Sequence, residues 1–107
     1  MARFLYLLRH AQSADKQPGQ SDLSRELTPR GVKQALLIGG HLLKQNTFLD
    51  CILHSVAERA RATASLVSDG MKFDPDRVIA HEDLYEASTR TFFQFINQID
   101  DQYQHVM

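Results

Sequence analysis

Short apolar runs alternate with helical stripes along this chain. Phe4–Leu8 is an uninterrupted apolar run, which predicts a β-strand buried on both faces. Leu49–Leu53 and Val78–Ala80 are similar and predict a second and a third strand. A polar stretch from Ala11 to Leu27 follows the first run, with a turn expected at Pro18-Gly19. Because this loop is long for a compact domain, we expect it to be functional.

Helical periodicity occupies the segments between these strands. Thr28 is a good N-cap and Pro29 suits the first helical position, so a helix is predicted to begin there. Its apolar stripe comprises Val32, Ala35, Leu36, Gly39, Leu42 and Leu43. A second helix is predicted over Val56–Ser68 and closed by Asp69-Gly70, and Ser88 is expected to cap a third.

This alternation of strands and helices predicts an α/β fold. We expect a three-layer sandwich with a mostly parallel central sheet and helices on both faces. Ligands then bind beyond the carboxyl ends of the strands. Residues 1–107 are expected to form a single domain. The segment His105-Val106-Met107 resembles the opening of a fourth strand, so we expect the sequence to lack the C-terminal part of the functional unit.

Composition narrows the class of protein. The 43% apolar and 23% charged residues are typical of a globular domain and argue against a disordered tail or a coiled coil. Twelve Lys and Arg against 13 Asp and Glu give a net charge of −1, so no nucleic-acid partner is expected. The early apolar run is too short to span a membrane, and the single Cys51 forms no internal disulfide. A cytoplasmic protein without a membrane partner is expected, with Cys51 in the core.

Candidate chemistry begins directly after the first predicted strand. Arg9 can offer a bidentate fork to phosphate oxygens, and a neutral His10 imidazole is a nucleophile near pH 7. The plainer alternative is a solvated strand end followed by a polar loop residue. Arg59 lies in the first turn of the second predicted helix, where free N–H groups favour an anion. Arg61 is about 200° further round that helix and cannot point at the same site.

Four sequence blocks carry a family resemblance. They read Leu7-Leu8-Arg9-His10-Ala11, Leu27-Thr28-Pro29-Arg30-Gly31, Ser55-x-Ala57-x-Arg59-Ala60-Arg61-x-Thr63-Ala64 and Leu84-Tyr85-Glu86-Ala87-Ser88. In this order they resemble the histidine phosphatase (phosphoglycerate mutase-like) superfamily, and most closely its SixA-type phosphohistidine phosphatases.

The resemblance implies roles for individual residues. His10 would be the nucleophile that becomes a phosphohistidine, and Arg9 and Arg59 would clamp the phosphoryl oxygens. Glu86 is the candidate proton donor to the leaving group, with Asp83 as the alternative. The family uses no metal, and no metal or other cofactor is expected here.

This chain departs from the family pattern in three places. Ala11 stands where glycine is usual, which is tolerable if its φ stays negative. Val56 replaces a proline. The second active-site histidine of the family, expected after a later strand in a Gly-His segment, has no match. His105 lies at the wrong end of the predicted fourth strand to take its place.

The sequence thus predicts a metal-independent phosphatase that works through a phosphohistidine. The SixA resemblance implies a phosphohistidine-bearing protein as substrate. The connection of about 18 residues after Arg9 leaves little chain to build a lid, which favours an open site. A small phosphate ester, a mutase-type phosphotransfer and a non-catalytic phosphate-binding module are the alternatives.

Overall fold

Four short strands run parallel to one another in the computed structural model, which describes residues 3–107. They are β1 (Phe4–Leu5), β2 (Ile52–Ser55), β3 (Val78–His81) and β4 (His105–Val106). β1 pairs with β4 and β2 pairs with β3, and a parallel bridge between Cys51 and Val106 joins the two pairs. The expectations of a parallel α/β fold and of a fourth strand at His105 are confirmed.

All three predicted strands have different limits from those expected, and β3 differs only in ending at His81 instead of Ala80. The ladder of β1 ends at Leu5, and the side chains of Phe4 and Leu7 are 52% and 70% exposed. The prediction of a strand buried on both faces over Phe4–Leu8 is therefore wrong. β1 pairs only with β4 within residues 3–107, so it is an edge strand. β2 begins at Ile52 and continues to Ser55, past the predicted limit at Leu53.

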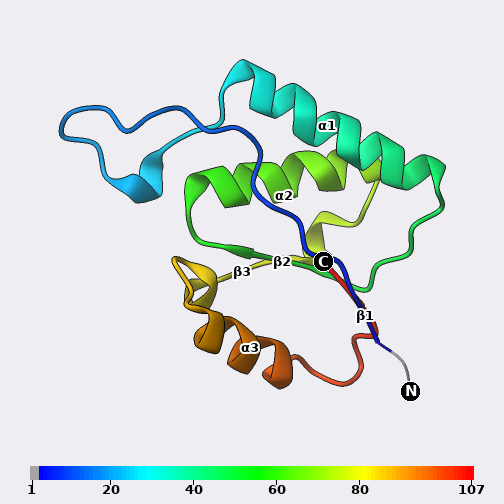
Figure 1. The fold of residues 1–107 in the computed structure, drawn as a ribbon. Coiled ribbons are helices and arrows are strands. Elements are labelled where there is room, and N and C mark those ends of the chain that lie inside the picture. The colour runs from blue at the N-terminus through cyan, green and yellow to red at the C-terminus, as the bar shows by residue number, and fades with distance from the viewer. Residues whose placement is uncertain (1–2) are drawn as a thin grey trace.

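Three α-helices surround the strands. They are α1 (Pro29–Lys44), α2 (Glu58–Met71) and α3 (Thr89–Gln98), with short 3-10 turns η1 (Asp22–Ser24), η2 (Pro75–Arg77) and η3 (Glu82–Leu84). Figure 1 shows α1 and α2 on one side of the strands and α3 on the other. The long connection between β1 and α1 projects away from the helices before η1 returns toward the start of α2.

The predicted starts of α1 and α3 are confirmed by their caps, whereas α2 begins at Glu58 instead of the predicted Val56 and has no side-chain cap. The Thr28 hydroxyl accepts a hydrogen bond from the Gly31 amide at 3.0 Å, and Pro29 is the first residue of α1. The Ser88 hydroxyl accepts from the Thr91 amide at 3.1 Å at the start of α3. In both places a side-chain oxygen satisfies an amide that has no partner within its helix.

The predicted end of α2 at Asp69-Gly70 is wrong. The helix continues to Met71 and ends at Lys72, whose φ of 58° is left-handed. Gly70 serves helix packing instead, since a Cβ there would lie 2.8 Å from the Leu36 carbonyl oxygen on α1. Gly39 on α1 is its counterpart, because a Cβ there would lie 2.4 Å from the Val67 carbonyl oxygen. The two glycines let α1 and α2 pack backbone against backbone.

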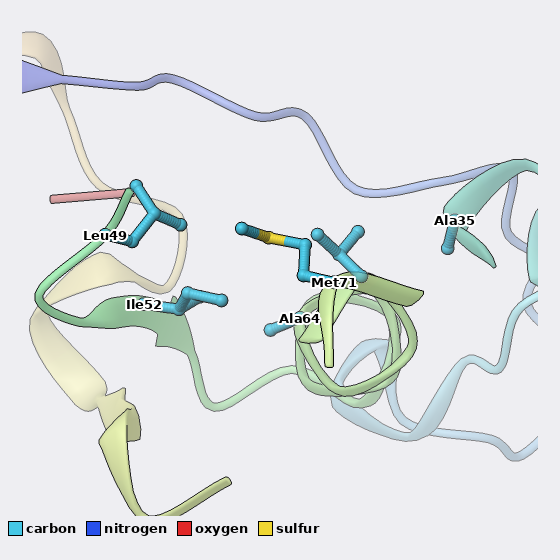
Figure 2. Packing of buried hydrophobic residues seen from close by; sticks show 6 residues of the cluster. Ala35, Leu49, Ile52, Ala64 and Met71 are labelled. Atoms are coloured by element: carbon cyan, nitrogen blue, oxygen red, sulfur yellow. The ribbon is translucent and has the colours of Figure 1, made fainter. Parts of the chain in front are cut away.

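The hydrophobic core lies around α2, between α1 and the strands. Figure 2 shows Ala64 on α2 facing Ile52 of β2, while Ala35 projects from α1 toward the other side of α2. Val67 and Ala35 are fully buried. Cys51 is buried at 1% exposure, which confirms its predicted place in the core. The packed centre therefore holds α2, the helix whose first turn carries Arg59.

Candidate active site

His10 follows β1 and is half-buried. Its Nδ1 lies 2.8 Å from the carbonyl oxygen of Ala11. A carbonyl oxygen only accepts hydrogen bonds, so Nδ1 carries the proton in the neutral ring and Nε2 keeps its lone pair. Ala11 is not among the three non-glycine residues with positive φ in the described chain, so it replaces the usual glycine without strain. The geometry thus leaves Nε2 as the nucleophilic nitrogen.

A pocket of about 560 Å³ opens beside His10. Arg9, His10, His54 and Ser55 line it, and these residues follow or end two strands at the carboxyl side. Its other walls are mostly apolar and come from the sheet, from α2 and from the inner face of α3. The expected position of the site at the carboxyl ends of the strands is therefore matched by a cavity.

Thr63 fixes the segment after His10 to α2. Its hydroxyl accepts from the Ala11 amide at 2.9 Å and donates to the Arg59 carbonyl at 2.7 Å. Thr63 is 4% exposed, so both hydrogen bonds are shielded from water. This relay connects the backbone beside the nucleophile to the first turn of α2, where Arg59 is located.

The side chain of Arg59 is engaged by the long β1–α1 connection. Its Nη1 donates to the Asp22 carbonyl at 2.9 Å and its Nη2 to Asp22 Oδ2 at 3.1 Å. The Arg59 side chain is 14% exposed, and its guanidinium carbon lies 6.0 Å from the centre of the Tyr85 ring. Within residues 3–107, the lining of the pocket includes Arg9 and His10 but not Arg59.

Three side chains from separate segments converge on Asp22. The Tyr85 hydroxyl donates to Oδ2 at 2.6 Å, Arg59 donates to the same oxygen, and Arg25 Nη1 donates to Oδ1 at 3.1 Å. These hydrogen bonds, that of Tyr85 foremost, lower the pKa of Asp22 from 3.8 to about 2. The same contact raises the pKa of the Tyr85 hydroxyl. Asp22 is therefore ionised at neutral pH.

The predicted proton donor lies outside this arrangement. Glu86 is exposed, follows Tyr85 and has a left-handed φ of 47°. Neither Glu86 nor Asp83 is among the described residues that line the pocket, although Leu84 between them is. Both carboxylates are thus close in the chain to a residue that lines the pocket, but neither belongs to the lining itself.

Arg61 and His105 lie as their positions in the sequence predict, and two further histidines, His41 and His54, lie on α1 and at the pocket. Arg61 pairs with Glu58 and is 55% exposed, away from the Asp22 contact of Arg59. His41 is exposed on α1, and His54 lines the pocket with its Nδ1 2.8 Å from the Ser55 carbonyl oxygen. His105 pairs with Phe4 at the amino end of β1, so it lies at the opposite end of the strands from His10.

No three His, Cys, Asp or Glu residues in the described part of the chain gather closely enough to hold a metal ion. The helices within residues 3–107 are also too short or too polar to cross a membrane.

Sequence reasoning missed Asp22, Arg25 and the hydroxyl roles of Thr63 and Tyr85. Thr63 and Tyr85 lie inside two of the sequence blocks, which was a signal that they serve the site. Asp22 and Arg25 lie in a polar loop whose only signal was its length. Asp22 binds Arg59 and Tyr85, which are 37 and 63 residues away in the chain, and no local pattern indicates such pairs.

The chain is similar in sequence to several curated proteins. The chain is 39% identical over 94 residues to an uncharacterised protein of Mycobacterium tuberculosis, covering 88% of this chain and 56% of that protein. It is 37% identical over 82 residues to the mitochondrial serine/threonine-protein phosphatase PGAM5 of Xenopus tropicalis, covering 77% of this chain and 28% of that protein. The chain thus spans little more than half, or less, of these curated relatives.

Solved structures share the fold over the whole chain. A crystal structure from Agrobacterium tumefaciens, assigned as the phosphohistidine phosphatase SixA, superposes with a TM-score of 0.88 at 29% identity. The superposition covers 100% of this chain and 68% of the Agrobacterium chain. The protein histidine phosphatase SixA complexed with tungstate has the same fold, with a TM-score of 0.77 at 22% identity.

The sequence model of the histidine phosphatase superfamily (branch 1) matches residues 5–105. This match spans nearly all of the chain and includes the segments that bear Arg9, His10, Arg59 and Glu86. The chain belongs to the histidine phosphatase superfamily.

Proposed function

We propose that this chain carries a phosphatase site at which His10 Nε2 attacks phosphorus and forms a phosphohistidine. The observation that carries the proposal is the 2.8 Å contact between His10 Nδ1 and the Ala11 carbonyl oxygen, in a pocket that Arg9 also lines. A carbonyl oxygen only accepts, so the proton is assigned to Nδ1 and Nε2 keeps its lone pair for the attack. In the first step a bond forms between Nε2 and phosphorus while the bond from phosphorus to the leaving group breaks. Water then attacks the phosphohistidine, releasing phosphate and restoring the ring.

The two arginines neutralise the phosphoryl oxygens in this mechanism. Arg9 is exposed at the mouth of the same pocket as His10, so its guanidinium can reach a phosphoryl group bound there. Arg59 adds a second guanidinium at the start of α2, where the helix dipole also favours an anion. Glu86 is proposed to protonate the leaving group, with Asp83 as its alternative, and either must turn toward the pocket to do so.

Phosphohistidine in a protein is the substrate we propose. Two SixA structures are named for this activity, and they share the fold over 100% and 92% of this chain. A phosphorus–nitrogen bond demands less of a proton donor than an alkyl phosphate does, and the candidate donors here lie outside the pocket lining. We also propose the three-layer sandwich for the whole fold and the cytoplasm as its location.

Trapping of the intermediate tests the reaction. The protein is incubated with a radiolabelled phosphohistidine-bearing protein, and we expect acid-labile, base-stable label on the wild-type chain and none on His10→Ala. His41→Ala is the matched control, because His41 is an exposed histidine on α1 that touches neither the pocket nor its walls. Label that persists in His10→Ala would contradict the assignment of the nucleophile.

Turnover of a substrate panel tests the specificity. The labelled protein is compared with sugar phosphates at equal concentration, and faster turnover of the sugar phosphates would contradict the proposed substrate. A non-catalytic phosphate-binding module is the second candidate function. Arg59 already binds the Asp22 carboxylate, which shows that it can hold an anion without any reaction. Binding of an oxyanion without any label would favour that candidate.

A further inference from the structure

Asp22 engages, through its carboxylate and its backbone carbonyl, the two Arg59 hydrogen-bonding groups that the proposed function assigns to the substrate. Arg59 offers Nη1 to the Asp22 carbonyl and Nη2 to its carboxylate, at 2.9 and 3.1 Å. A phosphoryl group is recognised by arginine through the same kind of contact, two N–H groups directed at oxygens of an anion. A phosphoryl group that binds these nitrogens therefore has to share their N–H groups with Asp22 or displace Asp22 from them.

The surroundings of the carboxylate are those of an oxyanion site. Arg25, Arg59 and Tyr85 come from the loop, from α2 and from the segment after η3, and all three donate to Asp22. Two guanidinium groups and a hydroxyl around one carboxylate compensate its charge from three directions. The cluster therefore holds an anion that the protein supplies from its own loop.

The loop segment that carries Asp22 has few buried contacts with the rest of the molecule. η1 contains no buried residue, and the loop around it runs over the surface. Arg25 joins the two arms of this loop, because its Nε and Nη2 donate to the Ala14 carbonyl and the Ser13 hydroxyl at 3.0 and 2.8 Å. The Ala14 amide also donates to the Glu26 carbonyl at 2.8 Å, so these tethers lie within the loop itself. A surface loop with few buried contacts opens at a small fraction of the cost of global unfolding.

Arg59 is also apart from the pocket in this conformation. Its side chain is 14% exposed beneath the loop, whereas Arg9 and His10 line the open pocket. We propose that Asp22 competes with the phosphoryl group of the substrate for Arg59, so that binding requires residues 12–27 to release the start of α2. This inference rests on the proposed function and adds that the contact between Asp22 and Arg59 has to open before Arg59 can bind the substrate.

Binding of tungstate, measured by calorimetry on the whole chain, tests the competition. Asp22→Asn keeps the shape of the side chain but removes its charge, and we expect it to lower the Kd for tungstate roughly 3- to 10-fold. Tyr85→Phe leaves the charge but removes one hydrogen bond to it, so a smaller decrease is expected. In the wild type, tungstate is expected to speed hydrogen exchange of amides in residues 20–26, because the loop is released.

The control is Asp15→Asn, which makes the same change of charge in the same loop. Asp15 is exposed, and within residues 3–107 the structure shows no ion pair for its carboxylate, so its Kd is expected to stay within about twofold of the wild type. Weaker or unchanged binding by both Asp22→Asn and Tyr85→Phe would overturn the competition and make Asp22 a positioning residue for Arg59.

Arg9→Gln separates this inference from the proposed function. If the wild type binds tungstate and Arg9→Gln does not, the phosphoryl site stands, and the Asp22 and Tyr85 variants alone decide the competition. If no variant and no wild-type sample binds tungstate, the proposed function and the competition both fail.

Discussion

The two sides of α2 differ in how they are packed. Toward α1, glycine backbones meet at Gly39 and Gly70, and Val67 is fully buried. On the other side, near its first turns, α2 borders a pocket of about 560 Å³ whose far wall is α3, and α3 has no buried residue. The first side is packed without a gap, whereas the second leaves space for a ligand. Arg59 and Thr63 belong to the well-packed helix and reach the open side, so the site is anchored on the rigid part.

The largest effect is expected from the arginine at the start of α2. Arg59→Lys loses the planar fork and should lower turnover of a phosphohistidine protein by roughly 10²- to 10³-fold. Arg61→Lys, two residues along the same helix, is the control and should stay within about twofold, because Arg61 pairs with Glu58 instead. Equal losses in both variants would show that the helix as a whole, and not the Arg59 fork, serves the site.

Truncation of one side chain on each side should show which side contributes more to the free energy of unfolding. Val67→Ala removes two buried methyl groups and leaves a cavity, so the free energy of unfolding in urea should fall by about 2–3 kcal/mol. Phe93→Ala on α3 removes a larger side chain that is 59% exposed and should cost less than about 1 kcal/mol. A larger loss from Phe93→Ala would reverse the comparison.

The helix contact gives a sharper test with adjacent glycines. Gly39→Ala places a methyl group against the backbone of α2, and we expect a loss of about 1–3 kcal/mol in urea unfolding. A Cβ at Gly40 meets nothing within 4 Å, so Gly40→Ala should instead stabilise the helix by about 0.5–1 kcal/mol. The opposite signs are the prediction, and the same sign in both would place the close contact elsewhere.

The smallest effect concerns Asp22 and acid. Its pKa is lowered from 3.8 to about 2 in the folded chain, so the folded state binds fewer protons than the unfolded state between these values. The stabilisation by Asp22 is therefore present above pH 4 and is lost as the pH falls toward 2. Asp22→Asn should unfold more easily than the wild type at neutral pH, and the difference should shrink across this window in pH-dependent urea melts. A difference that grows as the pH falls would contradict the lowered pKa.

The sequence by itself determined the class of fold, the starts of α1 and α3 and the family. Local chemistry sufficed there: Thr28 and Ser88 cap their helices with their own side chains, and apolar periodicity marked Ala35 and Gly39 as buried in α1. The same periodicity wrongly marked Leu36 and Leu43, which are 41% and 40% exposed. The order of four blocks indicated the family, and parallel strands then placed Arg9 and His10 at the carboxyl end of β1.

Only the tertiary structure decided the rest. Gly70 looked like a helix end because glycine favours termination, but its neighbour on α1 requires the missing Cβ inside the helix. The apolar run Phe4–Leu8 looked buried, but burial depends on what covers a strand and not on its composition. The contact of Asp22 with Arg59 and Tyr85 joins residues far apart in the chain, and only folding brings such charges within hydrogen-bond distance. The sequence pattern indicates which secondary structure each segment prefers, whereas the hydrogen bonds at Arg59 depend on which distant segments the fold brings together.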